Sequence, residues 1–76
     1  MLYEATIYPT INRSRFFWVA ESKKLKGCVG QGDTYNEAIK ELEENELEWI
    51  KSALEYGIPV PSIEDIENFG RIHFLW

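Results

Sequence analysis

The 76-residue sequence has few of the residue types on which disulfide frameworks, metal sites and membrane segments depend. Cys28 is its only cysteine and His73 its only histidine, so an internal disulfide is excluded and a zinc site built from several such ligands is not expected. It contains no run of about 18 apolar residues, and residues 1–6 lack the basic region and apolar core of a signal peptide. We therefore expect a cytoplasmic protein with no membrane span, no metal and no cofactor.

Motifs for common enzyme chemistry are also missing. Residues 27–32 contain three glycines but match neither the phosphate-binding loop nor the dinucleotide fingerprint, and we interpret them as part of a short edge strand or bulge. A carboxylate nuclease needs several acids converging on metal ions, and only Glu4, Glu21 and Asp33 lie in or beside predicted strands. We expect a protein that is not an enzyme and has no catalytic residue.

The net charge of −5 is concentrated in one segment. Residues 35–56 contain seven acids and two bases, whereas the rest of the chain has six of each. Such a segment disfavours direct nucleic-acid binding and would attract a basic partner, although a solvated helix face that aids solubility has the same composition. Arg13 and Arg15 precede Trp18, an arrangement that can hold single-stranded nucleic acid, but we favour a strand core flanked by charged loops.

The order of hydrophobic patterns predicts one α+β domain spanning residues 1–76. Period-2 alternation and β-branched or aromatic composition predict strands, whereas proline, asparagine and serine in residues 9–14 predict a loop. The expected fold is a three-stranded antiparallel sheet with one long helix packed on one face and a C-terminal strand, in the order β-β-β-α-β. The predicted strands are 2–8, 15–21, 28–31 and 71–76, with a short turn or helix over 63–69.

The ends of the long helix carry clear local signals. Thr34 followed by Glu37 is a capping-box arrangement, and Gly57 with Pro59 just beyond is typical of a helix C-terminus. Helical spacing groups apolar residues on one face: Ala38, Ile39, Leu42, Trp49, Ile50 and Ala53, with Leu54 at the edge. It groups glutamates on the opposite face: Glu37, Glu41, Glu44, Glu48 and Glu55. Glu46 falls on the apolar face, so it must be paired or lie at an opening, and we place it at the rim of the sheet.

The aromatic content predicts an interface. Eleven residues are Phe, Trp or Tyr, which is more apolar surface than one helix can cover on a small sheet. Edge strands rich in such residues also invite pairing between chains, so we expect a homodimer or higher homo-oligomer, or a partner-docking edge. The candidate partner-binding residues are Phe16, Trp18, Glu41, Glu44, Glu48 and Trp76.

Two motifs together resemble the HicB-type antitoxin family. The first is Leu25-x-Gly27-Cys28-Val29-x-Gln31-Gly32-Asp33-Thr34-x-x-Glu37-Ala38, and the second is Gly57-Ile58-Pro59-Val60-Pro61-Ser62. Within them, the residues expected to have structural roles are Gly27, Cys28, Gly32, Asp33, Thr34, Glu37, Gly57 and Pro59. Cys28 is read as a small buried side chain.

The resemblance implies a partial ribonuclease-H-like domain that generally lacks the nuclease acids. It further implies a partner, a small basic toxin that cleaves messenger RNA and that the antitoxin binds and blocks. The chain ends at Trp76, so we expect a short member without the C-terminal DNA-binding segment that many members carry. The alternative is a solitary HicB-like domain of unassigned role, either a nucleic-acid-binding sheet or an inactive nuclease-like remnant.

Overall fold

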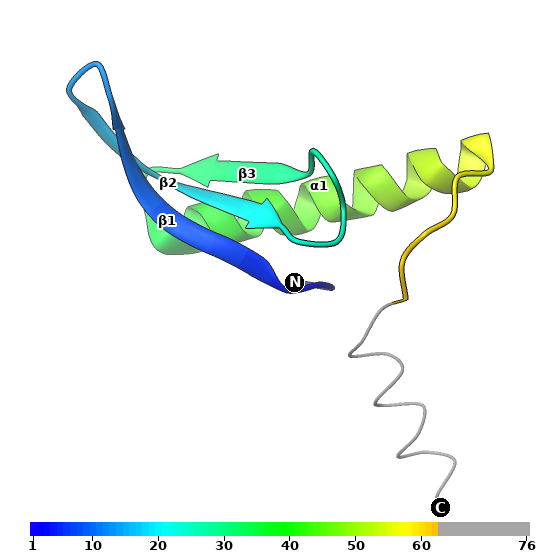
Figure 1. The fold of residues 1–76 in the computed structure, drawn as a ribbon. Helices are drawn as coiled ribbons and strands as arrows, with labels where there is room; N and C mark the ends of the chain where they lie inside the picture. The colour runs from blue at the N-terminus through cyan, green and yellow to red at the C-terminus, as the bar shows by residue number, and fades with distance from the viewer. Residues whose placement is uncertain (63–76) are drawn as a thin grey trace, which may run out of the picture.

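A computed structural model describes residues 1–62 as a three-stranded sheet followed by one helix (Figure 1). The elements are β1 (Ala5–Asn12), β2 (Arg15–Ser22), β3 (Val29–Gly32) and α1 (Tyr35–Tyr56). The strands are antiparallel in the order β1-β2-β3, which confirms the predicted α+β class. The predicted helix over 63–69, the predicted strand over 71–76 and the candidate residue Trp76 lie outside the described residues.

The first strand lies further along the chain than its prediction, which placed it at residues 2–8. β1 continues through Pro9, and a two-residue turn at Arg13 (φ 52°) and Ser14 (φ 67°) joins it to β2. This is the type I′ geometry, which asparagine and glycine usually signal, so the sequence offered no cue for it. Pro9 is tolerated because β1 is an edge strand and the proline position faces away from β2.

A tight turn leads from β2 to β3. Leu25 is fully buried, and the Cys28 N–H donates to the Leu25 C=O at 3.0 Å. Gly27, at φ 81°, supplies the positive φ that the third position of a type II turn requires. Gly27 thus shapes the turn through its positive φ, and Cys28 is buried.

The glycines of β3 allow α1 to pack directly on the strand. A Cβ built on Gly30 would collide with the backbone of Leu42 and Ala38, and one on Gly32 would lie 2.5 Å from the Glu37 Cβ. β3 is an edge strand as expected, but its glycines accommodate a close helix rather than a bulge. The core that results comprises Tyr3, Ala20, Leu25, Cys28, Ala38 and Leu42.

The predicted helix limits are confirmed. The Thr34 hydroxyl accepts from the Glu37 N–H at 3.1 Å, while the Glu37 carboxylate accepts from the N–H of Asp33 rather than from that of Thr34. At the other end, Gly57 adopts φ 68° and donates to the Ala53 C=O, as in a C-terminal cap.

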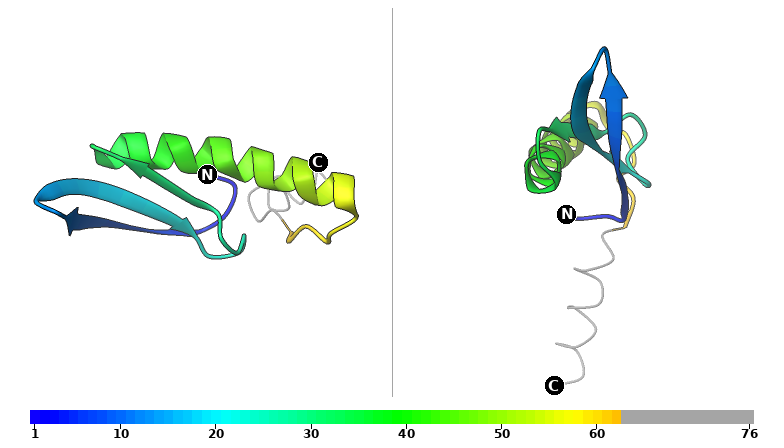
Figure 2. Two further views of the ribbon diagram at one scale, coloured as in Figure 1. Left: turned by 90° about the horizontal axis from the view of Figure 1, so that it is seen from above. Right: turned by 90° about the vertical axis from the view of Figure 1, so that its left-hand side faces the viewer.

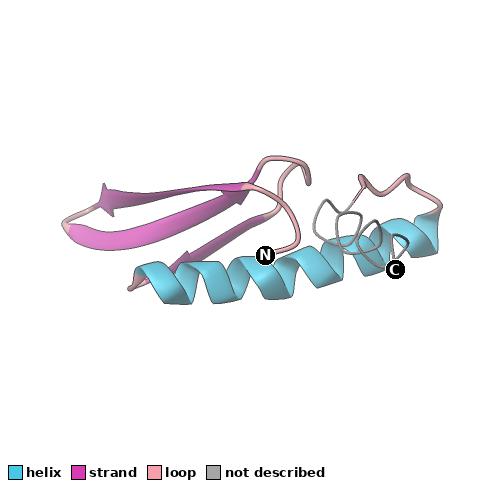
Figure 3. Ribbon diagram, turned by 90° about the horizontal axis from the view of Figure 1, so that it is seen from below, coloured by secondary structure: helices cyan, strands magenta, loops and turns pink. Residues whose placement is uncertain are grey.

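The sheet and the helix overlap along only part of their lengths. Figures 2 and 3 show the β1–β2 hairpin projecting beyond the N-terminal end of α1, whereas the C-terminal half of α1 extends past the sheet. Residues 58–62 turn back along that half, and the Tyr3 hydroxyl donates to the Pro61 C=O at 2.6 Å. The offset leaves apolar surface at both ends, at Ile11 and Phe16 on the hairpin and at Leu54 and Ile58 near the helix end.

Candidate docking surfaces

The outer face of α1 carries the chain's excess negative charge. The helix spans the same residues that hold seven acids and two bases, and six of those acids are exposed. Within residues 1–62, three of them have no hydrogen-bond or ion-pair partner: Glu44, Glu48 and Glu55. We call these three residues the acidic face.

Glu41 has a structural contact that its sequence position did not suggest. Its carboxylate accepts from the Gln31 N–H at 2.6 Å, and one turn later the Asn45 amide donates to the Val29 C=O at 2.6 Å. Both β3 groups point away from β2. The Ser22 N–H donates to the Cys28 C=O at 3.0 Å, so the even-numbered residues of β3 bond to β2 and the odd-numbered ones point outward. Side chains of α1 therefore cap the outer edge of β3.

Glu46 is fully buried, so its predicted place at the rim of the sheet is wrong. Its carboxyl oxygens accept from the Leu2 N–H at 3.2 Å and from the Tyr3 N–H at 3.3 Å. Close by, the N-terminal ammonium lies 2.9 Å from Glu43. The carboxyl group thus holds residues 1–3 against α1 before β1 begins, and it is paired as its burial demands.

The aromatic residues of β2 form a cluster with the start of α1. Trp18 packs edge-on against Phe16, with ring centroids 6.0 Å apart, and against Tyr35 at 5.4 Å. Trp18 is half-buried, whereas Phe16 is 54% exposed beside Ile11, its partner across the hairpin. Of the predicted aromatic docking residues that lie within residues 1–62, Phe16 and Trp18, Phe16 is therefore the more accessible.

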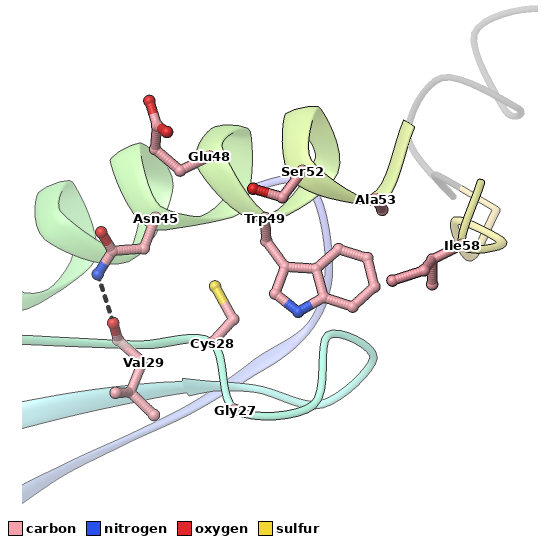
Figure 4. A pocket seen from close by; sticks show the side chains of 9 residues that line it. All are labelled: Gly27, Cys28, Val29, Asn45, Glu48, Trp49, Ser52, Ala53 and Ile58. Atoms are coloured by element: carbon pink, nitrogen blue, oxygen red, sulfur yellow. Dashed lines mark hydrogen bonds between the residues drawn. The ribbon is translucent and has the colours of Figure 1, made fainter. Parts of the chain in front are cut away.

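A groove of about 480 Å³ lies between the β2–β3 turn and the C-terminal half of α1 (Figure 4). The Trp49 indole forms one wall and donates to the Lys26 C=O at 3.3 Å, and Cys28 and Ile58 also line the groove. Burial, and secondarily the negative charge of Glu46, raises the pKa of the Cys28 thiol and disfavours the thiolate. The sequence did not signal this groove, because its walls come from three separate segments.

The three acids of the nuclease-like alternative do not converge on one site. Glu4 pairs with Lys23 at 3.7 Å, Glu21 accepts from the Tyr8 hydroxyl at 2.8 Å, and Asp33 pairs with Arg15 at 3.1 Å. The bond to Glu21 raises the pKa of Tyr8. Among residues 1–62 no group of three His, Cys, Asp or Glu side chains could hold a metal ion.

A base-stacking surface also lacks support from the strand register. Arg15 lies three residues from Trp18 along β2, and successive side chains of a strand alternate between faces. Arg15 accordingly lies over the Phe17 ring at 5.9 Å on one face, whereas Trp18 packs on the helix side.

Within residues 1–62, no helix combines the length and the apolar composition that crossing a membrane requires.

Comparison with known proteins identified a relative. The chain is 34% identical over 64 residues to the UPF0150 protein ssl0259 of Synechocystis sp., and the aligned region covers 84% of each protein. No family model matches the chain, and no solved structure matches it.

Proposed function

This chain belongs to the UPF0150 family. We propose that it is an antitoxin-like protein-binding module that binds and neutralises a small basic toxin. The observation that carries the proposal is the acidic face of α1, formed by Glu44, Glu48 and Glu55, which have no partners within residues 1–62. An exposed array of one charge sign attracts a partner of the opposite sign and speeds their encounter.

The resemblance of residues 25–38 and 57–62 to HicB-type antitoxins indicates the class of partner. In that family the partner is a small basic protein that cleaves messenger RNA. We leave Glu41, one of the predicted docking residues, out of the contact because its carboxylate accepts from the Gln31 N–H.

Co-expression with the product of a small adjacent reading frame, followed by affinity capture, tests the proposal. A variant with Glu44→Gln, Glu48→Gln and Glu55→Gln should bind roughly tenfold more weakly, since three exposed charge pairs at about 0.5 kcal/mol each sum to about 1.5 kcal/mol. Binding by the unmodified chain should also weaken as salt concentration rises.

A matched control removes the same charge from elsewhere in the protein. The variant Glu4→Gln, Glu21→Gln, Asp33→Asn has the same net charge as the acidic-face variant but keeps the acidic face. It should therefore bind as the unmodified chain does. Equal weakening in both variants would assign the effect to net charge alone. If no basic protein encoded nearby binds this chain, or if such a protein binds but stays toxic, the proposal of toxin neutralisation is wrong.

A further inference from the structure

The two edges of the sheet differ in their accessibility to another strand. At the β3 edge, Glu41 and Asn45 occupy the Gln31 N–H and the Val29 C=O, so an added strand would have to displace both side chains. β1 forms the other edge, where α1 extends no such side chain among residues 1–62. The helix packs mainly on β3 and β2 and barely touches β1.

The register shows which groups of β1 face outward. The Lys23 N–H donates to the Glu4 C=O at 2.9 Å, so the even-numbered residues of β1 bond to β2 and the odd-numbered ones point away. The outward donors therefore include the N–H groups of Ile7 and Ile11, and between them Pro9 has none. β1 offers a strand edge that is interrupted at one known position.

The side chains of β1 do not discourage pairing. Natural edge strands are commonly protected by charged residues, yet Ala5–Asn12 contains no charged side chain, and Pro9 is its only protective residue. Ile11 is 72% exposed, and Phe16, its cross-strand partner, is 54% exposed on the same face. An added strand would cover both the open backbone groups and this apolar surface.

We propose that β1 pairs with β1 of a second copy of this chain, antiparallel about a two-fold axis at Pro9. In this register Ile7 lies opposite Ile11 of the other copy, and each such pair exchanges both of its backbone hydrogen bonds. The two prolines face each other, so the missing donors fall in a single pair. Other registers lose the same two bonds but spread the loss over two pairs, because each proline then lies opposite a residue whose C=O receives no donor.

The charge distribution favours a second copy over a basic partner at this edge. The net charge of −5 lies in α1, on the far side of β3 and β2 from the β1 edge (Figure 3). Two copies joined through β1 therefore hold their acidic helices apart. A basic partner would be attracted to α1 instead. The inference is independent of the toxin-binding proposal, because it uses a different surface.

Sedimentation of the full chain over micromolar to high micromolar concentration tests the pairing. We expect a dimer whose dissociation constant rises by at least about tenfold in Ile11→Lys, because lysine would be desolvated at the seam. The matched control is Leu54→Lys, which makes the same charge change at a side chain that is 71% exposed on α1. The control should dimerise normally, and circular dichroism should show that both variants are folded.

Amide hydrogen exchange distinguishes this edge from other interfaces. The Ile7 and Ile11 N–H groups should exchange more slowly as concentration rises, and this protection should be lost in Ile11→Lys. A monomer at all concentrations, a dimer unaffected by Ile11→Lys, or a dimer without this protection would overturn the proposal. So would protection that appears only when a basic protein is added, because the edge would then serve a different partner.

Discussion

Glu46 connects α1 to the start of the chain. Its carboxyl group is buried within an otherwise apolar face, where an unpaired carboxyl would cost several kcal/mol, about 3 or more. The N–H groups of Leu2 and Tyr3 satisfy it, and neither is in a strand. The Tyr3 ring is itself buried, so the bonds to Glu46 position a core residue.

Replacing Glu46 with glutamine should destabilise the protein. In Glu46→Gln, an amide NH₂ takes the place of one acceptor oxygen and faces backbone donors, so we expect a loss of about 1–3 kcal/mol in the free energy of unfolding. Urea denaturation followed by circular dichroism measures this. The control is Glu44→Gln, at an exposed position on the same helix, which should change the free energy by less than about 0.5 kcal/mol. Equal effects would show that Glu46 does not hold the N-terminal residues.

At the scale of elements, the packing of α1 on β3 depends on the absence of a side chain at Gly30. An added Cβ would lie 2.6 Å from the Ala38 C=O oxygen and 2.9 Å from the Leu42 Cα, both in the rigid backbone of the helix. The helix would have to move away from the strand, which would also lengthen the bonds from Glu41 and Asn45 to β3. Close packing and edge capping are therefore coupled.

Gly30→Ala should consequently cost about 3 kcal/mol or more, at the upper end for overpacked sites. Gly27→Ala provides a comparison, since its Cβ would meet nothing within 4 Å and only the positive φ opposes it, at about 1–2 kcal/mol. Thermal unfolding of both variants measures the difference. An equal loss in the two would mean that the helix adjusts to the added methyl group without cost.

Signals within one element were readable from the sequence, whereas contacts between distant segments were not. The Thr34–Glu37 cap and the Gly57 terminus depend on neighbours within one turn, and both limits of α1 were predicted correctly. The Arg13–Ser14 turn was missed because neither residue is a usual choice for positive φ. The partners of Glu46 and Glu41 are backbone N–H groups, which every residue except proline possesses, so residue identity gives no indication of them.

At the scale of the whole molecule, charge and apolar surface are separated. The acidic face lies on one side of the protein, while the uncharged β1 edge lies on the other, beyond β2 and β3 (Figure 3). Two binding events could therefore occur together, one with a basic partner and one with a second copy. Capping of the β3 edge by α1 limits self-pairing to one edge, which would yield a closed dimer rather than an open chain of sheets.

Stability should decrease in alkaline solution because two core groups resist ionisation. Burial, with a smaller contribution from the charge of Glu46, raises the pKa of Tyr3 above its ordinary 10.0 and that of Cys28 above its ordinary 9.0. The unfolded chain therefore ionises at lower pH than the folded protein does. The stabilisation is fully present below about pH 9 and is lost as pH rises through the raised pKa values of the folded state. The urea midpoint, measured from pH 7 to 11, should be level up to about pH 9 and then fall.

In the double variant Tyr3→Phe, Cys28→Ser, the fall should be shallower, although the variant starts from a lower midpoint because it lacks the Tyr3 bond to Pro61. Tyr8→Phe is the control, since Tyr8 has a raised pKa that arises mainly from its exposed bond to Glu21, and its removal should change the slope less. A slope that is the same in the double variant and the unmodified chain would show that the alkaline loss originates outside this core.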